Sequence, residues 1–146
     1  MSDKPNYNLG RFKTAQESDY KIALSEIRNG RKVSHWMWYI FPQMKQLGIS
    51  PTAQYYGIGS LDEAKAYIAD NELRQHLIEI SEALLALESN NASQILGYPD
   101  DMKLKSSMTL FMLAAPDISV FQAVLDKFYG GEPDKKTIEL INNQEI

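Results

Sequence analysis

The residues best suited to chemistry stand in one short string in the first third of the chain. The string contains two cations, one of the two histidines and both tryptophans, and it reads Arg31-Lys32-Val33-Ser34-His35-Trp36-Met37-Trp38. Cations beside aromatic rings suit a nucleotide-like ligand, because the charge attracts phosphate and a ring can stack on a base. A helix that opens at Ser34 would add free backbone amides for an anion. We therefore expect a ligand site here, formed by Arg31, Lys32, Ser34, Trp36 and Trp38.

Two further side chains of this segment have chemical potential. His35 has an ordinary imidazole pKa of ~6.5, so it is a candidate acid–base catalyst. Gln43 follows the aromatic run, and a polar group held near the core needs a hydrogen-bond partner, which a ligand can provide. A structural interpretation stays open, in which Trp36 belongs to the core, the cations are solvated and His35 only begins a helix.

The second string with chemical potential is Lys103-Leu104-Lys105-Ser106-Ser107. Lys103 and Ser107 are four residues apart and therefore neighbours on one helix face. A lysine beside a serine can act as base and nucleophile or hold an anion. Lys103 is thus a candidate catalytic residue, and Ser106 and Ser107 are candidate ligand-binding residues. In the alternative interpretation the hydroxyls are buried and hydrogen-bonded, and Lys103 pairs with Asp100.

Several classes of site and function are excluded. The sequence has neither a GxGxxG loop nor a P-loop lysine motif. It has no cysteine, and its two histidines have no carboxylate at metal-ligand spacing, so we expect no metal and no cofactor. The net charge of −4 argues against general nucleic-acid binding, although the excess of basic residues among the first 60 could hold a small anion.

The expected cellular location of the protein is inferred from two features that the sequence lacks. No apolar run approaches the ~20 residues that a membrane span needs, so we expect no membrane association. The first residues also lack the apolar stretch of a signal peptide. We therefore expect a cytoplasmic protein.

The elements that position these residues are predicted to be helices throughout. Helix starts are marked at Thr14, Ser60, Asp70 and Ser119, where a capping residue precedes apolar residues at helical spacing. The aromatic run 36–41 does not alternate, so we expect a buried central helix that ends before Pro42. The fold class is therefore all-α, one compact domain over 1–146 with six to eight helices and short loops, and with loose tails at 1–8 and 142–146.

Two finer expectations follow from the same patterns. Any strand should be confined to a short piece near Val33 or Tyr56. The residues that should be almost fully buried lie on apolar helical stripes, and they are Leu77, Leu84, Leu104 and Phe111.

Taken together, these strings resemble the uncharacterised DUF1810 family. The resemblance runs from about residue 9 to 141, and it is carried by Leu9-Gly10-Arg11-Phe12-Lys13-Thr14-Ala15-Gln16, by residues 30–43, by residues 103–111 and by Phe128-Tyr129-Gly130-Gly131-Glu132-Pro133-Asp134. It implies an all-helical fold and no established activity. Members are often labelled calpastatin-like, but calpastatin is a disordered repeat protein and this chain is predicted to be compact.

Our main hypothesis is a cytosolic domain that binds a small phosphorylated or nucleotide-like metabolite, and whether it also processes that metabolite is left open. The pocket would lie between residues 31–43 and 103–109, and His35 and Lys103 would share it although 68 positions separate them. The alternative is a non-catalytic protein-interaction module, or a homodimer, that uses the aromatic surface near Tyr55 and Tyr56.

Overall fold

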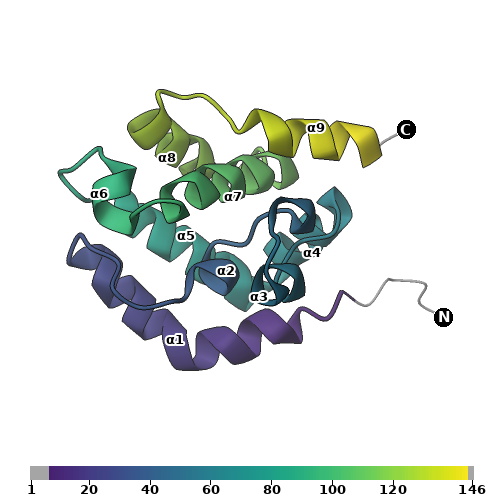
Figure 1. The fold of residues 1–146 in the computed structure, drawn as a ribbon, viewed down its shortest axis with the longest axis horizontal. Coiled ribbons are helices and arrows are strands. Elements are labelled where there is room, and N and C mark those ends of the chain that lie inside the picture. The colour runs from purple at the N-terminus through teal and green to yellow at the C-terminus, as the bar shows by residue number, and fades with distance from the viewer. Residues whose placement is uncertain (1–6, 145–146) are drawn as a thin grey trace.

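The fold is all-α, as the sequence predicts. The computed structural model describes residues 7–144, and within this range it contains nine α-helices, an isolated bridge between Met44 and Ile58, and a short 3₁₀ turn (Figure 1). The helices are α1 (Gly10–Arg28), α2 (Met37–Ile40), α3 (Pro51–Tyr55), α4 (Leu61–Ala69), α5 (Asn71–Leu85), α6 (Ala92–Leu96), α7 (Asp100–Ala114), α8 (Val120–Tyr129) and α9 (Lys135–Gln144). The helix count exceeds the expected range by one, because three helices have only four or five residues.

Helix α7 lies at the centre of the packing. It contacts α4, α6, α8 and α9, whereas α5 packs between α1 and α8 (Figure 1). The four residues expected in the core are all buried, which confirms the apolar stripes on α5 and α7: Leu77, Leu84, Leu104 and Phe111. Among the described helices, none is both long and apolar enough to cross a membrane.

Side-chain caps fix several of the helix starts. The Ser60 and Asp70 side chains accept hydrogen bonds from the backbone N–H groups of Glu63 and Leu73, as the sequence predicts. Helix α8 begins directly after Ser119, but that side chain makes no capping bond. At the other end of α8, Gly130 adopts a left-handed conformation with φ of 64°, which a glycine permits.

The start of α1 differs from the expectation. The helix begins at Gly10 rather than after Thr14, so the extra turn includes Arg11 and the fully buried Phe12. The Arg11 guanidinium donates to the carbonyls of Tyr55 and Gly57 and to the Glu63 carboxylate at 2.8, 3.0 and 2.7 Å. The burial of Phe12 and the hydrogen bonds of Arg11 explain why the helix starts one turn earlier.

The helix expected from Ser34 is also shorter than predicted, because α2 begins only at Met37. The Glu26 carboxylate accepts hydrogen bonds from the backbone N–H groups of Val33 and Ser34 and from the Ser34 hydroxyl. It also accepts one from the indole N–H of Trp36. Residues 33–36 therefore form a loop tied to α1, and the amides expected to hold an anion are already bonded.

The chain ends differ in part from the loose tails that we expected. Residues 142–144 continue α9, and the Gln144 side chain donates to the Gly59 carbonyl at 2.9 Å. The carbonyls of Tyr7 and Asn8 accept hydrogen bonds from Arg11. The expectations for residues 1–6 and 145–146 lie outside the described residues.

Candidate functional site

The two strings meet at one carboxylate, that of Asp100. The Lys32 ammonium lies 3.0 Å from Asp100 Oδ2, and the Lys103 ammonium lies 3.5 Å from Asp100 Oδ1. A backbone hydrogen bond of 2.7 Å from the Lys32 N–H to the Ile95 carbonyl also joins the first string to α6, the helix that precedes α7. Because two ammonium groups share one carboxylate, this cluster keeps an excess of positive charge, which attracts an anion.

Each lysine of this cluster also covers a tryptophan. Lys32 Nζ lies 5.1 Å from the ring centre of Trp36, and Lys103 Nζ lies 5.5 Å from that of Trp38. Both distances are within the range of cation–π attraction. Trp36 is only 1% exposed and belongs to the core, whereas Trp38 is half-buried. Of the two rings expected to stack on a ligand, Trp38 is thus the accessible one.

A small hollow lies beside the cluster. Its walls come from α2, from the segment after it, from the end of α3 and from α7, and the residues that line it are Met37, Trp38, Phe41, Gln43, Ala53, Tyr56, Gly57 and Lys103. The pocket expected between residues 31–43 and 103–109 therefore has a counterpart lined by Trp38, Gln43 and Lys103. The hollow is narrow, with about 10 Å³ for the centre of a water molecule, which is the space one water needs.

Three polar groups at this hollow have no hydrogen-bond partner among residues 7–144. They are the Gln43 amide, the Trp38 indole N–H and the Tyr56 hydroxyl. Burial raises the pKa of the Tyr56 hydroxyl, and Tyr55 beside it raises it further, so the group stays protonated and can donate. Together with the Lys103 ammonium, these groups can donate several hydrogen bonds to the oxygen atoms of a phosphate or carboxylate.

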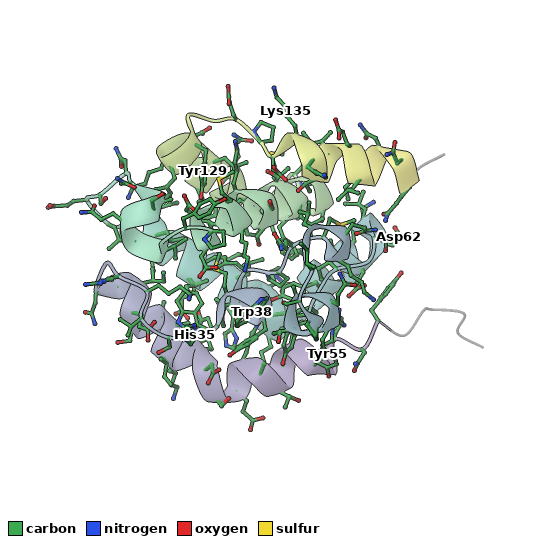
Figure 2. The ribbon with its side chains drawn as sticks, viewed as in Figure 1. His35, Trp38, Tyr55, Asp62, Tyr129 and Lys135 are labelled. Carbon is green, nitrogen blue, oxygen red and sulfur yellow. The ribbon has the colours of Figure 1, made fainter. Side chains whose placement is uncertain are left out.

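His35 and Arg31 lie at the edge of this region and not in the hollow. Both side chains are exposed, and neither has a partner among the described residues. The backbone carbonyl of His35 accepts a hydrogen bond from the Tyr39 hydroxyl at 3.3 Å. In Figure 2, His35 and Tyr55 lie on opposite sides of Trp38. Lys103, the proposed partner of His35, pairs with Asp100.

The three candidate serines lie elsewhere. Ser34 is bonded to Glu26, and the Ser106 hydroxyl bonds to the Met102 carbonyl and the Asp134 carboxylate at 3.2 and 3.1 Å. Ser107 is fully buried on α7, and its hydroxyl has no partner within residues 7–144. None of the three lines the hollow.

Two carboxylates organise the site in ways that the sequence does not indicate. The sequence indicates Asp100 only as an alternative partner of Lys103. Its contact with Lys32 could not be predicted, because Lys32 and Asp100 are far apart in the sequence. Glu26 received no role, although four hydrogen bonds converge on it. Burial by itself raises the pKa of Glu26, but these hydrogen bonds outweigh that effect and lower it to about 2.

Comparisons with known proteins agree with this helical arrangement. The family described as "Protein of unknown function (DUF1810)" matches residues 6–141. The chain is similar to the conserved hypothetical protein Rv1873 from Mycobacterium tuberculosis, with 43% sequence identity. The two structures superpose with a TM-score of 0.91 over 93% of this chain and 97% of that chain. No curated protein matches the chain.

Proposed function

The chain belongs to the DUF1810 family, whose description names no activity, and we propose from the geometry of the site that it binds a small phosphorylated or nucleotide-like metabolite. The carrying observation is that Lys32 and Lys103 share the single carboxylate of Asp100 beside the accessible ring of Trp38. In this proposal the two ammonium groups hold the anionic part of the ligand. Trp38 provides a face for a flat ring, and Gln43 donates a hydrogen bond.

Lys103 is the group that can exchange its partners for a ligand. Its distance from Asp100 is longer than that of Lys32, and its side chain is 25% exposed against 8% for Lys32. Moving the Lys103 ammonium off the face of Trp38 costs ~0.5–1 kcal/mol, which is the usual strength of an exposed cation–π contact. A charge-assisted hydrogen bond to phosphate, at ~1.5–3 kcal/mol, offsets that cost.

The narrow hollow limits which part of a ligand enters it. A space for one water admits a single functional group and not a whole nucleotide, unless the flexible Lys103 side chain moves aside. The proposal therefore places one anionic or polar group in the hollow and the rest of the ligand along Trp38. The acid–base role of His35 stays a prediction, and so does its joint site with Lys103, because its ring does not line the hollow.

A thermal-shift measurement with inorganic phosphate and adenosine monophosphate tests the proposal. At a concentration of ~100 Kd, a ligand should add ~2.7 kcal/mol to the free energy of unfolding. Lys103→Met should abolish this gain. Lys105→Met is the matched control, because Lys105 lies on the same helix and covers the ring of Tyr129 at 5.8 Å.

Asp100→Asn adds a test in the opposite direction. Removing the carboxylate frees both ammonium groups, so the affinity for phosphate should rise although the free protein loses stability. Quenching of Trp38 fluorescence by adenosine monophosphate but not by phosphate would show that the base stacks on the ring. The proposal is wrong if Lys103→Met and Lys105→Met respond equally to both ligands.

A protein-interaction surface near Tyr55 is the second candidate, and one observation favours it. Ile49 and Tyr55 are 96% and 56% exposed, whereas the ring of Tyr56 packs against Phe12 and Tyr39. Large exposed apolar side chains are typical of interfaces when they lie together. Sedimentation of the wild type and of Tyr55→Ser over a range of concentrations tests this alternative, since only an interface at Tyr55 makes the association depend on that residue.

A further inference from the structure

A second, wider groove runs between α1 and α5, away from the hollow at Trp38. It has a volume of about 530 Å³, and the residues that line it are Gly10, Lys13, Thr14, Gln16, Glu17, Tyr20, Lys21, Glu72 and His76. None of these residues lines the first hollow. The space is large enough for a small metabolite.

Gln16, at the base of this groove, fixes the proton position on His76. The Gln16 Nε2 group donates to the Tyr39 carbonyl at 2.7 Å and to the Tyr67 hydroxyl at 3.1 Å. A flipped amide would place its oxygen against the Tyr39 carbonyl oxygen, and neither atom can donate. Gln16 Oε1 therefore faces His76 Nδ1, at 2.9 Å, and Nδ1 must carry the proton.

This arrangement leaves Nε2 of His76 as an acceptor. In the neutral ring only one nitrogen carries a proton, so Nε2 has a free lone pair. No described residue bonds to Nε2. Nδ1 points to the buried Gln16, and His76 itself lines the groove, so Nε2 is the ring nitrogen left for a ligand in the groove.

Tyr20 holds the imidazole ring in place. The two rings stack with their centres 3.8 Å apart and their planes 10° apart. The Tyr20 hydroxyl donates to the Glu79 carboxylate at 2.5 Å, and the His76 carbonyl lies 3.0 Å from the same hydroxyl as a second acceptor for its one hydrogen. The imidazole is thus fixed by a hydrogen bond on one nitrogen and by a ring on one face, which is the kind of support that a binding group needs.

The charges of the groove do not favour an anion. Lys13 and Lys21 line it together with Glu17 and Glu72, and Lys13 is further neutralised by Asp70 at 2.6 Å. The groove offers acceptors from the carboxylates and His76, and donors from the ammonium groups and Thr14. A ligand with several hydroxyl groups matches this mixture, because each hydroxyl both donates and accepts.

We propose that this groove is a second ligand site, which takes a polyhydroxylated ligand such as a sugar, with one hydroxyl donating to His76 Nε2. The stacked pair of Tyr20 and His76 forms the apolar part of the wall, and Glu17 and Glu72 accept from further hydroxyls. The site is independent of the proposed anion site, since the two share no lining residue.

Nitrogen-15 NMR of the two histidines tests this proposal, with D-ribose as the neutral probe. His76 should carry its proton on Nδ1, and ribose should shift its Nε2 resonance. His35 is the internal control, because it is exposed and lines neither site. Inorganic phosphate should leave the His76 resonances unchanged.

Variants separate this site from the first. His76→Gln should abolish the ribose response seen at other groove residues, and His35→Gln should retain it. Lys103→Met should leave the ribose response intact, so loss of phosphate binding there and loss of ribose binding here are distinct results. A proton on Nε2 of His76, the absence of a ribose shift, or a larger shift with phosphate than with ribose would each overturn the proposal.

Discussion

The Glu26 carboxylate should make the stability of this fold depend on acid pH. It accepts hydrogen bonds from Val33, Ser34 and Trp36, and these bonds hold the loop that leads into Trp38. Its pKa is lowered from 4.5 to about 2, since these hydrogen bonds outweigh the effect of burial. A lowered pKa in the folded state means that the ionised carboxylate stabilises the fold above pH ~4.5. That contribution is lost as the pH falls from ~4.5 to ~2.

The size of this effect follows from the pKa difference. A difference of about 2.5 between 4.5 and 2 corresponds to at most ~3.4 kcal/mol, at 1.36 kcal/mol for each pH unit. Glu26 is only partly buried, so solvent screening reduces the contribution. We expect ~1–2 kcal/mol.

Urea unfolding at pH 7 and pH 3 measures this contribution. Glu26→Gln keeps an acceptor oxygen but removes the charge, so at pH 7 it should lose ~1–2 kcal/mol of stability. Between pH 7 and pH 3 the wild type should lose more stability than Glu26→Gln, by roughly 60% of that amount, because the rest of the contribution is lost only between pH 3 and ~2. Glu17→Gln is the control, because Glu17 is exposed on the same helix and should leave the pH dependence unchanged.

Equal losses of stability in the wild type and Glu26→Gln between pH 7 and pH 3 would refute the reasoning. Such a result would mean that other carboxylates cause the acid sensitivity. Asp70, whose pKa is also lowered, mainly through its hydrogen bond from Lys13 acting against burial, would then be the next residue to test.

Four further substitutions test the packing and the polar contacts. Ser107→Ala should leave the free energy of unfolding unchanged or raise it, because the buried hydroxyl lacks a partner, whereas Ser106→Ala should lower it by ~1 kcal/mol in urea unfolding. Arg11→Met should cost ~3–5 kcal/mol by the same measurement, because it leaves Glu63 buried without its ion pair. Leu104→Ala should cost ~2–5 kcal/mol, and a loss below ~1 kcal/mol would contradict its place in the core.

The helices and the core could be predicted from the sequence because their signals are local. Ser60 and Asp70 mark helix starts through residues three positions away, and the apolar stripes of α5 and α7 repeat within a few turns. The start of α1 could not be predicted in this way. It depends on contacts between Arg11 and residues of the α3–α4 region, more than 40 positions further along.

The candidate site was predictable in part for the same reason. Residue types pointed to Lys103, Trp38 and Gln43, which line one hollow. The sequence did not indicate that Glu26 would bind the amides near Ser34, nor that Asp100 would join the two lysines. Each of these carboxylates is an ordinary surface residue by type, and only its position in the folded chain gives it a partner.

Gly57 shows how one small residue shapes the wall of the hollow. Its backbone does not have the positive φ that favours glycine, so a turn conformation does not explain the residue. A Cβ atom at this position would lie only 2.5 Å from the Lys45 Cα. This close approach allows the bridge in which the Ile58 N–H donates to the Gln43 carbonyl at 2.9 Å. Gln43 and Tyr56, which supply two of the unpartnered polar groups, therefore share one wall because position 57 has no side chain.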